Sequence, residues 1–199
     1  MSTTLFLVRH GETVWHAENR YAGVSDVALT ERGRRQAARL ARWACRTGLD
    51  AVWASPLSRA RATAAPSARA LGLPVEVDAD LAELDFGSAE GRTLAELPPE
   101  QAAAFRADPV AGAFPGAEDP VAAAARGAAA LHRIAARHPG GRILVVAHNT
   151  LLRLVLCELL GLPLARYRTA FPVLRNCCPT ELVMDRGGAG LVALNTPLP

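Results

Sequence analysis

The sequence lacks the patterns that mark several large classes of proteins. Its four cysteines are scattered and form no Cys-x-x-Cys pair, so a zinc site is not expected. It has no Gly-x-x-x-x-Gly-Lys-Ser/Thr segment, which argues against a P-loop nucleotide site. No leader-like run begins the sequence, and its most apolar helical stretch is interrupted by Arg153 and Glu158, so a membrane span is not expected. The scattered thiols predict a reducing, cytoplasmic location.

Charge of one sign is not in large excess. The net charge of the 199-residue chain is +3, and its arginines are spread along predicted helices instead of gathering in one patch. Such spacing is typical of solvated helix faces, so no nucleic-acid partner is expected. Hydrophobic residues make up 50% of the chain, which is enough for a sizeable core, and the length fits one domain over residues 1–199.

Short apolar segments alternate with helical patterns along the chain. Strands are predicted at 5–8, 51–54, 75–77 and 143–147, and a C-terminal hairpin at 181–184 and 191–194 around a glycine-rich turn at 187–190. Helices are predicted at 31–46, 57–71, 120–137 and 150–160. The alternation predicts a three-layer α/β/α sandwich with a mostly parallel central sheet. Residues 91–120, rich in Pro, Ala and Gly, predict a small helical, lid-like insertion over the site.

The most informative segment is Arg9-His10-Gly11-Glu12-Thr13, which directly follows an apolar strand. In open α/β sheets, ligands bind at the C-terminal ends of the strands. A guanidinium and an imidazole at such an end suit a phosphoryl-type substrate, because Arg is a planar phosphate donor and His can act as a nucleophile. Other polar segments follow later strands at 55–59, 83–87 and 148–150. The converging candidates are Arg9, His10, Arg59, Glu83 and His148.

This set of residue types can carry out phosphoryl transfer. An imidazole attacks phosphorus, while guanidinium groups and a second imidazole hold the phosphoryl oxygens and offset their charge. A carboxylic acid protonates the leaving oxygen and then activates water against the phosphohistidine. Glu83, Asp85 and Glu90 are the candidates for that acid.

The chain resembles the histidine phosphatase superfamily, in its phosphoglycerate mutase-like branch. The matching segments are 9–13, 29–37, 55–64, 83–91 and 145–148, which cover most of the chain in the family's order. The resemblance implies an α/β/α fold, no metal and no other cofactor. It also implies that His10 is the phosphorylated nucleophile, that Glu83 is the proton donor, and that Arg9, Arg59 and His148 form the phosphate pocket.

The chain departs from the family's pattern along the pocket wall. Position 16 is usually Asn, whose amide helps to hold the phosphate, whereas His16 keeps one donor and has a charge that depends on pH. Ala22 stands where a polar residue usually precedes glycine, and Asn149 replaces the first of two glycines. The residues predicted to bind substrate or phosphate are His16, Arg20, Tyr21, Ala22, Gly23 and Asn149. These departures leave the substrate's identity open.

The sequence predicts a phosphomonoesterase that hydrolyses a small phosphorylated metabolite through phospho-His10. Family spacing to Gly87 favours Glu83 as its acid. The alternative is a 2,3-bisphosphoglycerate-dependent phosphoglycerate mutase, which uses the same intermediate. In the family, mutases carry longer segments after the acid motif, so the modest, Ala-rich stretch at 91–143 favours the phosphatase. A non-catalytic phosphate-binding module is disfavoured because all five candidate residues are retained. A homodimer is compatible with the sequence, which does not indicate the oligomeric state.

Overall fold

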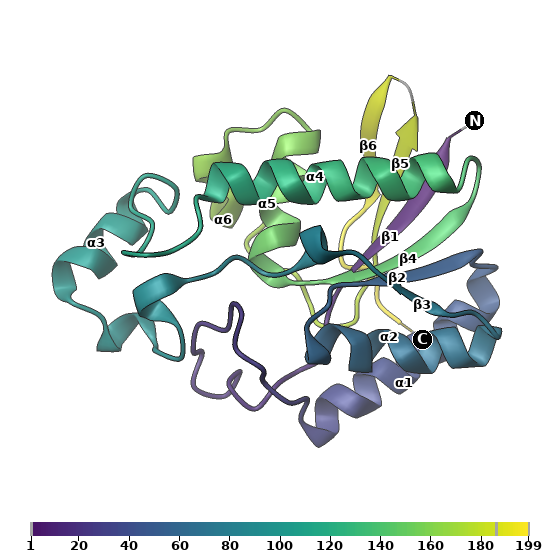
Figure 1. The fold of residues 1–199 in the computed structure, drawn as a ribbon, viewed down its shortest axis with the longest axis horizontal. Helices are drawn as coiled ribbons and strands as arrows, with labels where there is room; N and C mark the ends of the chain where they lie inside the picture. The colour runs from purple at the N-terminus through teal and green to yellow at the C-terminus, as the bar shows by residue number, and fades with distance from the viewer. Residues whose placement is uncertain (1, 186, 199) are drawn as a thin grey trace.

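A computed structural model describes residues 2–185 and 187–198, with a six-stranded sheet at its centre (Figure 1). The strands are β1 (Thr3–Arg9), β2 (Ala51–Ala54), β3 (Val75–Val77), β4 (Arg142–Ala147), β5 (Thr180–Asp185) and β6 (Gly188–Ala193). Their order is β3-β2-β4-β1-β5-β6; β3, β2, β4 and β1 are parallel, while β5 is antiparallel to both β1 and β6. The predicted α/β fold with a mostly parallel sheet is therefore confirmed.

Helices cover both faces of this sheet (Figure 1). One face carries α1 (Glu31–Thr47) and α2 (Ser58–Leu71), and the other carries α4 (Pro120–Arg137) and α5 (Asn149–Leu159). The remaining helices are α3 (Pro99–Ala107), α6 (Tyr167–Ala170) and the short 3₁₀ turns η1 (Ala79–Leu81), η2 (Gly87–Ala89), η3 (Leu94–Glu96) and η4 (Leu164–Arg166). Within the described ranges, no helix is both long and apolar enough to cross a membrane.

The core lies on both sides of β1, and its side chains alternate between them. Leu5 and Leu7 join the cluster under α4 and α5, whereas Phe6 and Val8 join the cluster under α1 and α2. Successive strand residues point to opposite faces, so a strand covered on both sides reads as an uninterrupted apolar run. The register pairs Arg9 with Ala147, which brings the C-terminal ends of β1 and β4 side by side.

The predicted helix boundaries follow from local chemistry. The Gly33 N–H donates to the Thr30 hydroxyl over 3.0 Å, which caps the start of α1. The helix ends at Gly48, whose φ of 66° is the left-handed conformation that glycine adopts without strain. At the start of α4, the Asp119 side chain accepts a hydrogen bond from the Val121 N–H, and Pro120 occupies the first turn.

One predicted boundary, that of the glycine-rich turn at 187–190, was wrong. The predicted glycine-rich turn lies mostly in β6, where Gly188 pairs with Asp185 and Gly190 pairs with Val183. Strand pairing uses backbone groups, which glycine supplies as well as any other residue. The connection between the two strands is therefore only residues 186–187, and residue 186 lies outside the described residues. Within the predicted helical insertion at 91–120, α3 begins at Pro99 because proline fits a helix's first turn.

Candidate active site

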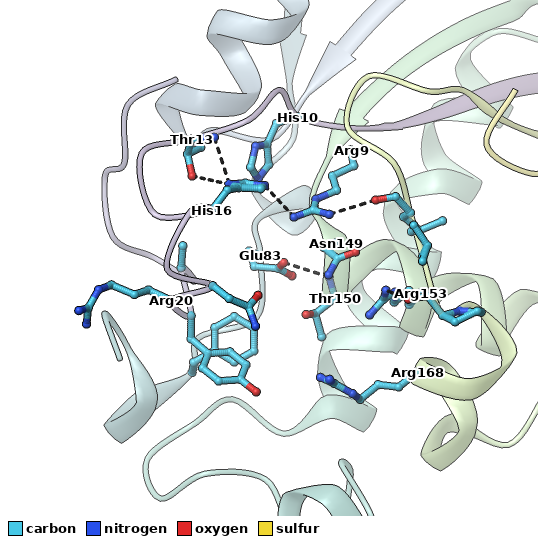
Figure 2. A pocket seen from close by; sticks show the side chains of 17 residues that line it. Arg9, His10, Thr13, His16, Arg20, Glu83, Asn149, Thr150, Arg153 and Arg168 are labelled. Carbon is cyan, nitrogen blue, oxygen red and sulfur yellow. Dashed lines mark hydrogen bonds between the residues drawn. The ribbon is translucent and has the colours of Figure 1, made fainter. Parts of the chain in front are cut away.

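A cavity of about 360 Å³ lies at the C-terminal ends of β1 and β4 (Figure 2). Its walls come from the end of β1, the loop at 13–22, the segment at 83–86, the first turns of α5, and residues 168–174. The predicted site residues that line it are Arg9, His10, His16, Arg20, Tyr21, Ala22, Glu83 and Asn149. Arg59, Gly23 and His148 lie behind this lining.

The His10 ring is fixed by a hydrogen bond to its neighbour's backbone. Its Nδ1 lies 2.7 Å from the Gly11 carbonyl oxygen, which can only accept, so Nδ1 carries the proton. Burial lowers the pKa of His10 well below its ordinary value, and the charges of Arg59 and Arg9 lower it further. The ring is therefore neutral near pH 7, and Nε2 carries a free lone pair at the cavity wall.

His148 packs beside His10, with 5.2 Å between the ring centroids. The His148 side chain is fully buried, and its Nε2 lies 2.7 Å from the Ser55 hydroxyl oxygen. Burial lowers its pKa well below the ordinary value, and the nearby charges of His10 and Arg59 act in the same direction. Among the described residues its Nδ1 has no hydrogen-bond partner, so this atom can still form a hydrogen bond.

The Arg9 guanidinium is held from two sides. Its Nη1 donates to the Leu174 carbonyl over 3.0 Å, and its Nη2 donates to His16 Nε2 over 2.8 Å (Figure 2). Burial lowers the pKa of Arg9 to about 10, and the charge of Glu83 opposes that shift. Arg9 therefore stays charged near neutral pH and presents a fixed cation beside His10.

His16 occupies the loop wall but makes a different bond from the one the sequence predicts. Its Nε2 faces Arg9 Nη2 and, at 3.2 Å, the Asn176 amide nitrogen, both of which only donate. Nε2 therefore accepts, while Nδ1 lies 2.8 Å from the Thr13 hydroxyl oxygen and 3.1 Å from the Thr13 backbone N–H, which donates to it. Burial lowers the pKa of His16 to about 4, and the charge of Arg9 contributes to the shift. A neutral acceptor for Arg9 thus replaces the predicted phosphate donor.

Glu83 is 5% exposed and binds the N-terminal turn of α5. Its carboxylate accepts from the N–H groups of Thr150 at 3.0 Å and Leu151 at 2.8 Å, and from its neighbour Leu84 at 3.0 Å. Burial raises the pKa of Glu83, while these backbone donors oppose the rise. A buried carboxyl with a raised pKa at the cavity wall suits proton transfer.

The two rival carboxyls have structural partners instead. Asp85 accepts from the Gly87 N–H, and Glu90 accepts from the N–H groups of Gly23 and Ser25. Neither Asp85 nor Glu90 lines the cavity.

Arg59 lies in the first turn of α2, is 1% exposed and braces the loop that follows Tyr21. Its guanidinium donates to the carbonyls of Ala22 at 3.0 Å, Gly23 at 2.6 Å and Ser25 at 2.8 Å. The guanidinium does not line the cavity, but its charge lowers the pKa of His10. Arg59 thus acts on the site through the loop and through its electrostatic field.

The segment at 91–120, all of it described, contributes no residue to the cavity lining. Phe105 and Phe114 stack with 4.4 Å between their ring centroids and pack against Tyr21. Tyr21 in turn lies 4.9 Å from Phe86, between ring centroids, and both line the cavity. The insertion therefore supports one wall from behind, and its lid-like role stays a prediction.

Sequence reasoning missed several residues of the site. Thr13, Thr150, Arg153 and Arg168 line the cavity. Asn176 donates from its side-chain amide to the His10 carbonyl over 2.6 Å. An arginine inside the apolar sequence of α5 was a signal for Arg153, but Asn176 carries no signal in the sequence. Among the described residues, no group of three or more His, Cys, Asp or Glu side chains could hold a metal ion.

Comparison with known proteins places these features in context. A sequence model of the histidine phosphatase superfamily (branch 1) matches residues 5–197. A probable phosphoglycerate mutase GpmB of Cronobacter sakazakii is 38% identical over 87% of this chain and 81% of its own. Phosphoserine phosphatase 1 of Hydrogenobacter thermophilus is 34% identical over 82% of this chain and 79% of its own. The solved structure of a mycobacterial glucosyl-3-phosphoglycerate phosphatase with VO3 has a TM-score of 0.88 at 29% sequence identity. The match covers 98% of this chain and 99% of that one.

Proposed function

Since the chain belongs to the histidine phosphatase superfamily, we propose that it hydrolyses small phosphomonoesters through a phosphohistidine on His10. One observation carries the proposal: the Nδ1–H of a neutral His10 is held by the Gly11 carbonyl, which leaves the Nε2 lone pair free at the cavity wall. An imidazole fixed in this tautomer is a ready nucleophile toward phosphorus. The bond to the carbonyl also stabilises the ring as it gains positive charge.

The first half-reaction uses the residues around His10. Nε2 attacks phosphorus, and the bond from phosphorus to the leaving oxygen breaks. Glu83, whose pKa burial raises, gives its proton to that oxygen, so an alcohol departs. Arg9 offsets the charge on the phosphoryl oxygens, His148 packs beside the attacking ring, and Arg59 adds its positive field from behind the loop.

The second half-reaction restores the enzyme. The Glu83 carboxylate takes a proton from water, whose oxygen bonds to phosphorus as the bond from phosphorus to Nε2 breaks. Inorganic phosphate leaves, and both His10 and Glu83 return to their starting states. Every group in this scheme is a protein side chain, so the proposal includes no metal.

Two of the similar proteins support hydrolysis, being named as phosphatases of phosphoserine and of glucosyl-3-phosphoglycerate. The mutase remains the second candidate because the relative at 38% identity is named a probable phosphoglycerate mutase. A mutase must keep water away from the phosphohistidine. No residue of the described segment 91–120 lines the cavity, which favours hydrolysis. The four cysteines are free thiols, which supports a cytoplasmic location.

The test combines trapping with turnover. After brief mixing with a radiolabelled phosphomonoester, we expect label on His10 that is lost in acid and stable in alkali, and none in His10→Ala. Incubation with 3-phosphoglycerate should release inorganic phosphate faster than it forms 2-phosphoglycerate. Faster isomerisation would establish the mutase, and full turnover by His10→Ala would refute the mechanism.

A further inference from the structure

Two arginines at the far end of the cavity have no part in the proposed reaction. Arg153 in α5 and Arg168 in α6 both line the cavity. Figure 2 shows Arg153 beside Thr150, and Arg168 beyond Glu83 and Thr150 as seen from His10. None of the ion pairs between described residues involves either guanidinium. This end of the cavity therefore carries positive charge that the protein does not pair with a carboxylate.

Arg153 is held in place although its charge is unpaired. The residue is 8% exposed, and its Nη2 donates to the Pro172 carbonyl over 2.6 Å. Its Nε is buried without a hydrogen-bond partner among the described residues. Burial lowers the pKa of Arg153 and the charge of Arg168 lowers it further, while the charge of Glu83 opposes the shift. A buried cation beside a second cation is unfavourable unless an anion offsets the charge, so this part of the cavity favours an anionic group.

Arg168 reaches the same place from the rim. It is exposed, and its guanidinium carbon lies 5.1 Å from the centroid of the Phe105 ring, over which it stacks. Burial raises the pKa of the Tyr21 hydroxyl, and the neighbouring charge and hydrogen bond of Arg168 oppose that rise. The aromatic cluster of Tyr21, Phe105 and Phe114 thus positions this second cation at the cavity.

We propose that Arg153 and Arg168 bind a carboxylate of the substrate while the phosphate lies at His10. The inference rests on the proposed phosphatase function and deepens it, because it names the substrate class as small phosphomonoesters that carry a carboxylate. Guanidinium groups match the two oxygens of a carboxylate. Arg153 has one nitrogen bound to Pro172 and another enclosed, so a single edge of its guanidinium is left for the substrate.

Two esters that differ at one group provide the test. 3-Phosphoglycerate carries a carboxylate where glycerol 3-phosphate carries a hydroxymethyl group. We expect kcat/KM to favour 3-phosphoglycerate by about tenfold or more, the effect of one charge-assisted hydrogen bond. Arg168→Gln should reduce this ratio by about tenfold. Arg166→Gln, on the same exposed segment and outside the cavity, should leave the ratio unchanged.

A second substitution guards against misfolding of the buried position. Arg153→Lys keeps a cation and a donor for Pro172, so it should fold, as circular dichroism would show, yet lower the same ratio because the guanidinium fork is lost. A ratio near one in the wild type, or one that neither substitution changes, would overturn the carboxylate site. Preference for fructose 1,6-bisphosphate over 3-phosphoglycerate would also overturn it, in favour of a second phosphate.

Failure of the proposed function would look different. If p-nitrophenyl phosphate is hydrolysed in a His10-dependent way while the two glycerol esters react equally, the phosphatase stands and the carboxylate site falls. If no ester is hydrolysed, the phosphatase falls. In that case calorimetric binding of 3-phosphoglycerate, weakened by Arg168→Gln, would still support the site, and absence of binding would overturn both proposals.

Discussion

His16 accepts a hydrogen bond from Arg9, with 2.8 Å between its Nε2 and the arginine Nη2. Because only a neutral ring can accept there, the orientation of Arg9 depends on His16 staying unprotonated. The pKa of His16 is lowered to about 4, so the contact is intact across the neutral range. We interpret His16 as a positioning residue that aims the Arg9 guanidinium at the phosphate.

His16 should make the folded state sensitive to mild acid. Its pKa falls from an ordinary 6.5 to about 4 on folding, so between these pH values the unfolded chain binds the extra proton. The free energy of unfolding should therefore fall as pH drops from 6.5 to 4. His10 and His148 also have lowered pKa values and act in the same direction. Urea titrations at pH 5 and pH 7 give the loss of stability on acidification, and the difference in that loss between wild type and His16→Asn is the contribution of His16. His132→Asn, an exposed position on α4, is the matched control. Equal pH dependence in wild type and His16→Asn would remove His16 from this role.

Glu83→Gln should slow the release of poor leaving groups most. Without a proton donor, kcat for an alkyl phosphate should fall by about 10² to 10⁴, whereas p-nitrophenyl phosphate, whose leaving group needs little protonation, should be affected much less. Steady-state kinetics over a series of leaving groups measures this. Asp85→Asn changes a carboxyl that only holds the Gly87 N–H, so it should not alter the dependence on leaving group. Parallel losses for both classes of ester in Glu83→Gln would rule out the acid role.

Arg59→Met should destabilise the fold. The substitution leaves the carbonyls of Ala22, Gly23 and Ser25 without their donor, so we expect a loss of about 2–3 kcal/mol in the free energy of unfolding. Arg61→Met, an exposed position on the same helix, should change stability by less than about 0.5 kcal/mol. Chemical denaturation measures both values. Similar stabilities for the two variants would contradict the bracing role.

Gly33→Ala should lower the free energy of unfolding, because Gly33 lies where α1 contacts the loop that follows β1. A Cβ on Gly33 would lie 2.1 Å from the Glu12 carbonyl oxygen, so the backbone must move apart, at about 2 kcal/mol or more. A Cβ on Gly48 would meet no atom within 4 Å, so Gly48→Ala only places alanine in a left-handed backbone conformation, which costs about 1 kcal/mol. Thermal unfolding of the two variants compares them directly. A smaller effect in Gly33→Ala than in Gly48→Ala would contradict the close approach.

The sequence predicts local structure well where one residue determines it. Thr30 and Gly48 bound α1 as their chemistry requires, and the family and fold class are confirmed. His10 and Glu83 could be placed at one cavity because parallel strands end at the same edge.

What the sequence could not predict depends on packing between distant segments. Arg168 in α6 and Asn176 reach the site from the segment between α5 and β5, which carries no strand-end signal. The direction of the His16 hydrogen bond depends on where the Arg9 guanidinium points, which the residue type at position 16 does not reveal.

The segment at 174–177 is hydrogen-bonded to the last residue of β1 and to the residue that follows it. Leu174 accepts from Arg9, Asn176 donates to the His10 carbonyl, and the Cys177 N–H donates to the Arg9 carbonyl. His10 is thus supported by a residue that lies 166 positions away in the sequence. We therefore expect the site to be completed late in folding, because the long loop of chain between these two segments must close first.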